Sequence, residues 1–538
     1  MAGTVIENLS TRKLVVILLA LLVAEIVLIL IGAFIAPRPS WAAPSGMKSC
    51  YKSEKDWELP KICKEAGLDD TIDSNVPDHP SKVVFTRVIP PQNFTMYRWF
   101  QYVVGYLTFT RTVDKRVNMT SYVPIENPEM TFNFTLGYSD QIGARLIPEA
   151  WTLLANSIEK RTLSCDYAAD RSEYDCEPVF AFQLGSVPHK QYVLNMGIPL
   201  GRFMPNNDER IDDETNTQID KISDMQFIMI SQTGGFTRVW LSIKTVLFII
   251  MLFPTVWFWR RVAILARKSM LIEKSIFALA LSLLFLNFPL EYLTIFYDVP
   301  WMLLVTDIRQ GFFYAVLFSF WVIFMGEHLM DQAHRNKISA YRWHLGSIFT
   351  ASFALLSFDL AERGIQIVNP FATIWTHPSF GYALLAIGTL AGLLYIILLL
   401  YLLYKVFRSI SYKRKFILPD HRAVHFEAIV SRLKRLMMVT VLTAGLTVIF
   451  FFLQQTFEGL FHDFFPADVQ VASAFFTGVY GLWNIYVFLV LSLYAPSHKL
   501  YEFSAATDEN SENEMVALRS TTEQTQILQM TQLKDRED

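Results

Sequence analysis

The segment LVVILLALLVAEIVLILIGAFIA, residues 14–36, is an almost uninterrupted apolar run. In a helix, about 20 such residues cross the hydrocarbon core of a bilayer, which is about 30 Å thick. The whole chain has a similar character, because 52% of its 538 residues are hydrophobic, 14% are aromatic and only 18% are charged. This composition is too apolar for an ordinary soluble domain, so the sequence predicts a membrane protein.

Seven further stretches have the length and the apolar character of a membrane span. Together with the first, they predict a polytopic α-helical membrane protein with about eight spans. The seven stretches lie at 236–259, 275–296, 309–328, 345–367, 379–407, 433–456 and 468–495.

The distribution of lysine and arginine predicts the side of the membrane on which each loop lies, because short basic loops stay in the cytoplasm. Loops 297–306 and 457–467 contain no lysine or arginine, whereas the loops that alternate with them are basic. We therefore expect both termini in the cytoplasm and residues 37–235 in the lumen. The basic residues assigned to the cytoplasm are Arg12, Lys13, Arg260, Arg261, Arg267, Lys268, Lys274, Arg335, Lys337, Arg342, Lys405, Arg408, Lys413, Arg414, Lys415, Arg422, Arg432, Lys434 and Arg435.

The cysteines support this orientation, because disulfides form in oxidising compartments. All four cysteines of the chain fall within the segment assigned to the lumen. Four cysteines allow three pairings. The short separations favour Cys50 with Cys63 and Cys165 with Cys176.

Glycosylation sequons are a second and independent marker. Those at Asn93, Asn118 and Asn133 lie in the lumenal segment and are expected to carry glycans. The sequon at Asn8 lies on the cytoplasmic side, where it should stay unmodified.

The beginning of the lumenal segment leaves one alternative open. The small residues of WAAPSG, 41–46, are typical of a signal-peptidase site. The apolar run before them is long for a signal peptide, which favours an uncleaved first span. Cleavage would leave seven spans and the same lumenal assignment.

The lumenal segment predicts an antiparallel β-sandwich of about 150 residues, because it contains alternating, β-branched and aromatic runs. Residues 143–160 are expected to form its one helical insertion. The expected strands lie at 82–89, 120–125, 130–138, 178–187, 190–198 and 225–232. The resulting organisation is a cytoplasmic N-terminus (1–13), a first transmembrane helix (14–36), the lumenal β-sandwich domain (37–235), a seven-helix transmembrane bundle (236–495) and a disordered cytoplasmic tail (496–538).

Charged residues in the lumenal halves of the spans are the first candidates for a functional site, because each costs at least about 2.5 kcal/mol at mid-bilayer. Two interpretations remain open: a polar mouth that opens toward the lumenal domain, or salt bridges that hold the bundle together. The residues are Glu291, Arg309, Asp359, Glu362 and Arg363.

The last span supplies the second group of candidates. Its sequence FFTGVYGLWNIYVF, residues 475–488, combines aromatic rings with Gly478 and Gly481. Small residues beside large rings either let two helices pack closely or leave a slot for a flat or chain-like apolar ligand. The side chains that would line such a slot are Phe476, Tyr480, Trp483 and Asn484.

Motifs for catalysis and for cofactor binding are absent from the sequence. It contains no P-loop, dinucleotide fingerprint, nucleophile elbow or HExxH motif, so we expect no enzyme, no cofactor, no metal and no nucleic-acid partner. Glu327, His328, Asp331 and His334 have side chains of metal-ligand type. Their spacing matches no zinc motif, and a solvated helix end is the expected interpretation.

Longer runs of sequence resemble the Wntless family, the sorting receptors for secreted Wnt proteins. The resemblance extends from MAGTVIENLSTRK at the N-terminus to LYAPSHK, residues 493–499, and does not include the tail. The densest matches are GSVPHKQYVLNM (185–196), QTGGFTRVW (232–240), DIRQGFFYAVLFSFWVIF (307–324), ERGIQIVNPF (362–371) and SAFFTGVYGLWNIYVF (473–488).

The resemblance implies a cargo receptor that takes up palmitoleoylated Wnt in the endoplasmic reticulum and Golgi, carries it to the plasma membrane for secretion, and returns through endosomes with retromer. The implied partners are acylated Wnt, retromer, clathrin adaptors and membrane lipids. The implied fold is a lumenal β-sandwich over a bundle similar to that of G-protein-coupled receptors, with the acylated hairpin of Wnt entering the membrane core. The resemblance also favours a cargo-binding role for the charged and aromatic candidates above.

Sorting signals of the family fall on the cytoplasmic side. The tyrosine-based endocytic signal appears here as FEAI, residues 426–429, and the aromatic-Leu-Met retrieval element as RLM, residues 435–437. A dileucine-like pattern occurs in the tail. The candidate sorting residues are Phe426, Ile429, Leu436, Met437, Ile527 and Leu528.

Two alternatives belong to other classes of protein. A signalling receptor of the G-protein-coupled type agrees with the large lumenal domain and the basic loops. The additional N-terminal span and the absence of a DRY-like sequence after the third helix of the seven weigh against it. A membrane acyltransferase is the second alternative, and no catalytic constellation supports it.

Overall fold

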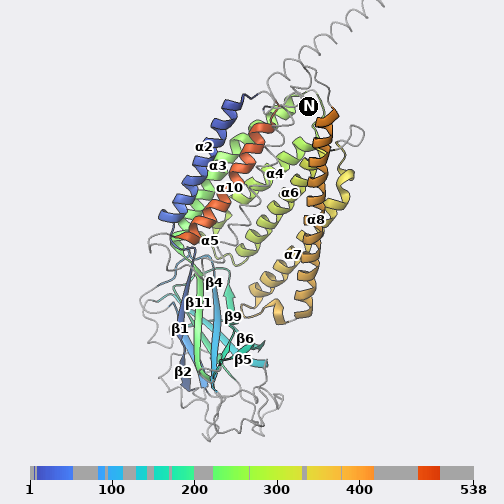
Figure 1. Cartoon of the computed structure of the whole chain (residues 1–538). Helices are drawn as coiled ribbons and strands as arrows, with labels where there is room; N and C mark the ends of the chain where they lie inside the picture. Colours follow the sequence, from blue (N-terminus) through green and yellow to red (C-terminus); the bar gives the residue numbers. More distant parts are fainter. Residues whose placement is uncertain are drawn as a thin grey trace, which may run out of the picture.

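The computed structural model consists of a β-sheet domain packed against one end of a bundle of long helices (Figure 1). It describes residue 5 and residues 9–51, 83–90, 95–112, 129–141, 151–168, 173–198, 222–265, 267–329, 336–376, 378–416 and 470–496. Several expected features lie outside these residues, namely the strand at 120–125, the span at 433–456 and the tail beyond residue 496.

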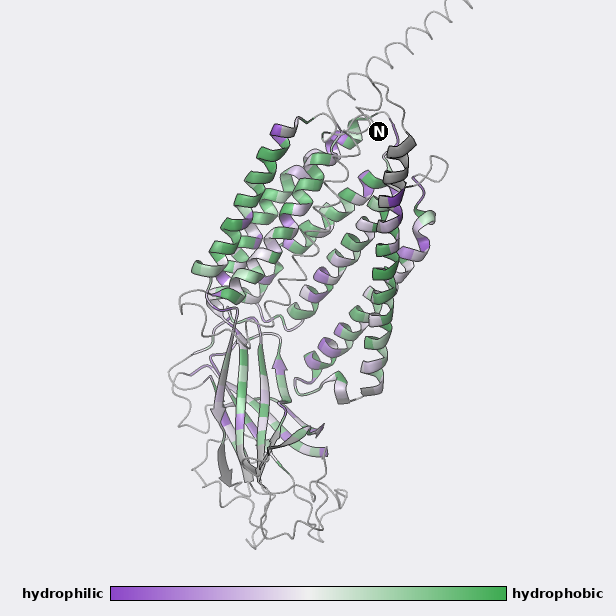
Figure 2. Cartoon of the chain, viewed as in Figure 1, coloured by the Kyte–Doolittle hydropathy of each residue, from purple (hydrophilic) through white to green (hydrophobic). Residues whose placement is uncertain are grey.

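Seven helices among the described residues are long and apolar enough to cross a membrane, and each coincides with a span expected from the sequence. Hydrophobic residues occupy most of the length of these helices (Figure 2). The long helices are α2 (Thr11–Leu30), α3 (Gly234–Ile264), α4 (Leu271–Asn287), α6 (Met302–Leu329), α7 (Arg342–Val368), α8 (Pro378–Phe416) and α10 (Val471–Tyr494). Short elements extend four of them: η1 (Ile31–Ile35) continues α2, and η6 (Leu290–Tyr292) and α5 (Leu293–Phe296) follow α4. The other two are η7 (Ile338–Tyr341), which precedes α7, and η8 (Ile374–Thr376), which precedes α8.

Capping side chains determine where two of these helices begin. Ser10 accepts a hydrogen bond from the backbone of Lys13 before α2, and Thr233 accepts one from the backbone of Phe236 before α3. Such caps satisfy N–H groups that have no partner within the helix. Thr233 follows the last strand of the sheet domain directly, so its cap also fixes the point at which the chain changes from strand to helix.

One expected span is broken. The stretch 275–296 ends its α-helix at Asn287, and Pro289 separates α4 from η6 and α5. Proline interrupts a helix because it has no N–H donor and its ring clashes with the preceding turn. A break at membrane depth is tolerated only where the freed carbonyl groups find partners inside the protein.

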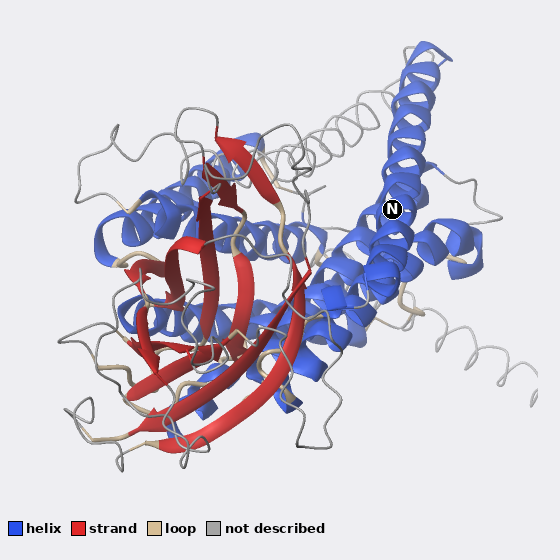
Figure 3. Cartoon of the chain, turned by 90° about the horizontal axis from the view of Figure 1, so that it is seen from below, coloured by secondary structure: helices blue, strands red, loops and turns tan. Residues whose placement is uncertain are grey.

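The sheet domain is a sandwich of two antiparallel sheets, as expected (Figure 3). One sheet has the order β1-β11-β4-β8-β7, with β9 also paired to β4, and the other has the order β2-β3-β10-β5-β6. The strands are β1 (Ser40–Gly46), β2 (Lys48–Tyr51), β3 (Val83–Ile89), β4 (Val103–Thr112), β5 (Glu129–Ser139), β6 (Thr152–Thr162), β7 (Cys165–Ala168), β8 (Glu173–Cys176), β9 (Val179–Leu184), β10 (Gln191–Gly197) and β11 (Ile222–Gln232).

Phenylalanine rings fill the space between the two sheets. Phe109 of β4 stacks on Phe132 of β5 with ring centroids 5.8 Å apart, so side chains from the two sheets meet directly. Phe132 and Phe134 are fully buried, while Asn133 between them is only half-buried. This alternation is the one expected for a strand with one face on a core. The sequon at Asn133 therefore lies on the outer side of its sheet, and those at Asn93 and Asn118 lie outside the described residues.

The expectation of a helical insertion at 143–160 is wrong for the described part of that range. Residues 152–162 form the edge strand β6, which pairs with β5 along its whole length. Leucine, alanine, glutamate and lysine in this segment favour a helix by propensity, but pairing with a neighbouring strand overrides so weak a preference. Strands β1, β2, β4, β7 and β8 were also not among those expected.

A loop of the bundle fixes the sheet domain in place. After α7 ends, Phe371 inserts into the core of the sandwich, where it is fully buried and stacks on Phe134 at 5.4 Å. The side chain of Asn369 donates to Glu159 of β6 at 2.8 Å, and the carbonyl of Pro370 accepts from the backbone of Gln183 at 2.8 Å.

Arg161 adds a charged contact to the same junction. Its guanidinium donates to the carbonyl of Phe371 and lies 3.4 Å from the carboxylate of Glu159. Burial lowers the pKa of Arg161, and the charge of Glu159 opposes that shift. One side chain of the bundle, Phe371, therefore belongs to the core of the sandwich, and a hydrogen-bond network crosses the same junction.

Candidate functional site

The first group of candidate residues forms a buried triad of Lys244 on α3, Glu291 on η6 and Arg309 on α6. Lys244 Nζ lies 2.5 Å from Glu291 Oε1, and Arg309 Nη1 lies 3.4 Å from the same oxygen. Lys244 is 2% exposed and Arg309 is 0% exposed. The triad holds two cations and one anion, and Glu291 Oε2 has no hydrogen-bond partner among the described residues.

The break in the third span explains how Arg309 is held. Its guanidinium donates to the carbonyl groups of Phe285, Leu286 and Phe288, which lie at the C-terminal end of α4. The last carbonyl groups of a helix lack partners within it and carry the negative end of its dipole. The carbonyl of Phe288, just beyond α4, also accepts from the backbone of Leu290 at 2.8 Å. Arg309 therefore donates to carbonyl groups at the break, and the negative end of the helix dipole that they carry offsets part of the positive charge of the triad.

Amide side chains extend this polar layer to α10. Asn287 Nδ2 donates to Asn484 Oδ1 at 2.6 Å, and the hydroxyl of Tyr480 donates to Asn287 Oδ1 at 2.6 Å. Asn484 Nδ2 in turn donates to the carbonyl of Tyr480 at 2.9 Å. Hydrogen bonds of this kind hold membrane helices together, so two of the α10 candidates join α10 to α4.

The other three charged candidates form a second cluster between α6 and α7. Arg363 Nε lies 3.3 Å from Asp307 Oδ2, and Asp359 lies close enough to both residues for electrostatic interaction. Glu362 accepts hydrogen bonds from Gln366 and from the backbone of Ile374, and so fixes the start of η8 to α7.

The structure thus brings the five charged candidates together as two clusters rather than as one ring. Asp307 and Arg309, two residues apart on α6, belong to different clusters. Lys244, Asp307 and Glu25 were missed, although Lys244 and Glu25 are charged residues within expected spans and the same criterion would have found them. Among the described residues, both carboxylate oxygens of Glu25 are buried without a hydrogen-bond partner.

The glycines of α10 serve close packing. A Cβ atom on Gly478 would lie 2.9 Å from Ile29, and one on Gly481 would lie 2.5 Å from Leu28 and 2.8 Å from Glu25. Helix α2 therefore occupies the space beside these glycines. The two glycines therefore allow close packing of α2 on α10. Of the four side chains named for a slot, Asn484 lines an apolar groove between α2 and α3.

On its other side, α10 contributes to an aromatic cluster inside the bundle. Trp483 is buried, with its ring centroid 6.0 Å from that of Trp321 and 6.5 Å from that of Tyr314. The aromatic cluster consists of Phe313, Tyr314, Phe318 and Trp321 of α6, Tyr395 of α8 and Trp483 of α10. Phe476 does not belong to it, because its ring is 39% exposed and packs against Phe236 of α3.

A cavity of about 250 Å³ lies where the sheet domain meets α6 and α7. The segment that joins β9 to β10 forms one wall, and Arg363 and Gln366 of α7 form part of the other. The imidazole of His189 on the rim stacks on Tyr138 at 3.7 Å and lies 3.2 Å from Asp140. Burial raises the pKa of Tyr192 in the wall, so its hydroxyl stays neutral. This junction cavity connects the second charged cluster to the sheet domain.

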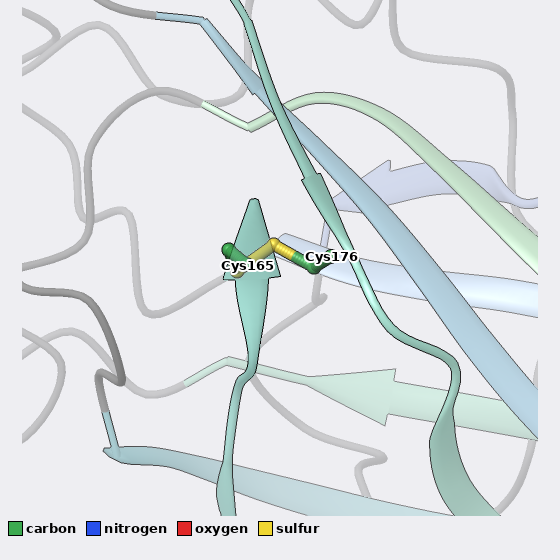
Figure 4. The surroundings of a disulfide bond; sticks show 2 residues. All are labelled: Cys165 and Cys176. Carbon is green, nitrogen blue, oxygen red and sulfur yellow. A yellow bond between two sulfur atoms is a disulfide. The ribbon is translucent and has the colours of Figure 1, made fainter. Parts of the chain in front are cut away.

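Cys165 and Cys176 form a disulfide between the paired strands β7 and β8 (Figure 4), which confirms one of the two pairings favoured by the sequence. The pairing of Cys50 with Cys63 is not tested, because Cys63 lies outside the described residues. The candidate sorting residues Phe426, Ile429, Leu436, Met437, Ile527 and Leu528 lie outside them as well.

Glu327 differs from expectation. It is buried, not solvated, and accepts hydrogen bonds from the hydroxyl of Tyr341 and the backbone of Asn336. It therefore joins the end of α6 to Asn336 and to Tyr341 of η7. Asp331 and His334 lie outside the described residues. Among the residues that the structure describes, no group of three or more His, Cys, Asp or Glu side chains is arranged to hold a metal ion.

Comparison with known proteins matches nearly the whole chain. A family model described as the Wntless GOLD domain matches residues 39–232, and one described as the Wntless-like transmembrane domain matches residues 233–498. The two ranges meet where β11 ends and the cap of α3 begins.

Curated relatives match over similar lengths. Protein wntless homolog B of Xenopus laevis is 38% identical over 528 residues, which cover 94% of each chain. Protein wntless homolog of Homo sapiens is 38% identical over 523 residues, which cover 93% of this chain and 92% of the relative. Protein wntless of Drosophila mojavensis is 36% identical over 548 residues, which cover 97% and 95%.

Proposed function

The chain belongs to the Wntless family, whose role lies in Wnt secretion, and we propose that it acts as a cargo receptor that binds palmitoleoylated Wnt. In this proposal the sheet domain contacts the protein part of the cargo, and the helical bundle shelters the acyl chain. The junction cavity lies between these two parts and is the point of entry.

The observation that carries the proposal is the position of the junction cavity. It lies between a sheet domain fixed by Phe371 and the polar ends of α6 and α7. Arg363 and Gln366, which also bond to Asp307 and Glu362, line this cavity. Their N–H groups are of the type that donates to the backbone carbonyl groups of a bound loop. A cavity with both apolar walls and a few convergent polar groups is typical of a binding site.

The aromatic cluster supports a place for the acyl chain within the bundle. Its rings provide an apolar lining, and burial is worth about 0.8 kcal/mol for each CH₂ group, so a chain of about 16 carbons would contribute strongly to binding. Among the described residues, Trp483 Nε1 and the hydroxyl of Tyr395 are buried without partners. A hydrocarbon chain offers these two polar atoms no hydrogen-bond partner, so the aromatic cluster supports the proposal through its apolar lining alone.

The transport cycle is part of the same proposal. We expect the receptor to load Wnt in the endoplasmic reticulum and Golgi, release it at the plasma membrane and return through endosomes with retromer and clathrin adaptors, with both termini in the cytoplasm. No observation on the described residues favours a signalling receptor, and the family is one of transport proteins rather than enzymes.

Co-purification tests whether the acyl group is required. The full-length chain should capture wild-type Wnt, and it should capture far less of a Wnt whose acylated serine is replaced by alanine, because most of the apolar contact is then lost. A Wnt with a substituted surface lysine far from the acylated loop serves as the matched control. Equal capture of acylated and non-acylated Wnt would show that the lipid does not contribute.

A further inference from the structure

A second and larger cavity lies on the outside of the bundle, away from the aromatic cluster. Helices α2 and α3 both pack on α10, and an open groove of about 730 Å³ runs between them with α10 as its floor. Helices α2, α3 and α10 lie side by side at one edge of the bundle in Figure 1. Below, this cavity is called the outer groove.

The length of the outer groove matches one leaflet of a bilayer. Along α2 it extends from Leu21 to Ile35, which corresponds to roughly 20 Å at 1.5 Å per residue. One leaflet with its headgroup region is about 20 Å thick, half of the roughly 40–45 Å of a whole bilayer. The groove therefore begins near the middle of the membrane and ends at the boundary on the side of the sheet domain.

The lining of the groove is mostly apolar. Aliphatic side chains such as Val27, Val246 and Ile250 line it, and polar side chains are few. Its volume lies within the range of about 300–1,000 Å³ that is usual for ligand pockets. Such a lining suits hydrocarbon chains rather than a polar ligand.

A single charged residue, Arg238 in the first turns of α3, lies at the end of the groove that faces the sheet domain. Its guanidinium lies over the rings of Trp99, at 5.2 Å, and Tyr97, at 5.8 Å. Tryptophan and tyrosine are enriched where a membrane meets water. Arg238 is exposed, and no carboxylate of the described residues forms an ion pair with it.

From these observations we infer that the outer groove is a specific binding site for a glycerophospholipid of the leaflet on the side of the sheet domain. The phosphate bonds to Arg238, whose planar guanidinium matches the geometry of phosphate oxygens. The two acyl chains lie along the aliphatic walls between α2 and α3. The lipid fills a gap that neither helix closes alone, and so it joins the N-terminal helix α2 to the bundle. This site is separate from the proposed cargo site.

The test counts lipid that remains bound. The full-length chain is reconstituted in vesicles of palmitoyl-oleoyl phosphatidylcholine, transferred to mild detergent and weighed by native mass spectrometry. The wild-type chain should retain about one phospholipid, as expected for a single pocket. Arg238→Ala should lower the affinity roughly tenfold, because it removes a charge-assisted contact. Arg260→Ala, an exposed arginine at the other end of the same helix, is the matched control.

A second variant tests the position of the acyl chains. Val246→Trp fills the groove and should abolish retention, whereas Val256→Trp, on the same helix outside the groove, should not. Vesicles that contain dioleoyl glycerol, which has no phosphate, should load the wild-type chain poorly. Equal retention in Val246→Trp and wild type, or equal retention of phospholipid and dioleoyl glycerol, would overturn the inference. So would crosslinking of the acyl chain of Wnt to groove residues, whereas loss of phospholipid with normal capture of Wnt supports it.

Discussion

Replacement of Glu291 by glutamine is expected to destabilise the bundle more than any other single change to its polar residues. Lys244 Nζ and Arg309 Nη1 both contact Oε1 of Glu291, and all three side chains are buried. Loss of the carboxylate leaves two buried cations without a counter-charge, and removal of one partner from a buried ion pair costs about 3–5 kcal/mol. We expect a clearly lower midpoint of thermal unfolding for the purified full-length chain in detergent.

A double substitution separates charge from shape. Lys244→Met removes one cation and keeps a side chain of similar length, so in the Glu291→Gln background it should restore part of the lost stability. Asp307→Asn is the matched control, because Asp307 also pairs with an arginine but its side chain is 31% exposed. A pair that is partly exposed to solvent is expected to contribute less than a fully buried one, and an exposed pair is worth only about 0–1 kcal/mol. If Glu291→Gln and Asp307→Asn both have the same midpoint of thermal unfolding as the wild type, the triad does not stabilise the bundle.

Truncation of Phe371 to alanine should loosen the sheet domain from the bundle. The ring is fully buried in the sandwich although it belongs to a loop of the bundle, and it stacks on Phe134 with an angle of 11° between the rings. Removal of a core phenylalanine side chain costs about 3–5 kcal/mol. Here the loss falls on the contact between two parts of the protein, so we expect faster cleavage by added protease at the junction and weaker capture of Wnt.

Controls for this substitution lie in the same region. Phe371→Leu should keep part of the apolar contact and behave between the wild type and Phe371→Ala. Phe353→Ala, on α7, removes a ring that is 64% exposed on the surface of the bundle and should leave both protease sensitivity and capture unchanged. Protease sensitivity of Phe371→Ala equal to that of the wild type would show that the junction is held by other contacts.

Much of the architecture could be predicted from the sequence because it depends on composition and period. Seven apolar runs coincide with long helices, and the alternating run at 130–138 forms the inner strand β5. The break at Pro289 is visible in the sequence as a proline inside an apolar run, but the run looked continuous by hydropathy alone. Strand β6 was missed because its local residues favour a helix and only pairing with β5 decides otherwise.

The candidate site was predicted in part. The five charged candidates within spans do find partners, since a low-dielectric surrounding penalises an unpaired charge. Which partners they find depends on tertiary structure. Arg309 bonds to carbonyl groups freed by the helix break, and Phe371 packs on a ring more than 200 positions away in the chain. No local pattern around either residue indicates these contacts.

The central claim is that the bundle shelters the acyl chain of Wnt, and photo-crosslinking tests it most directly. Wnt that carries a photoactivatable analogue of palmitoleate is bound to the full-length receptor and irradiated, and the labelled peptides are identified by mass spectrometry. The account predicts labels on α6, α8 and α10 around the aromatic cluster. Labelling should be weak when the free analogue is only mixed with Wnt and is not attached to it. Labels confined to strands of the sheet domain would contradict it.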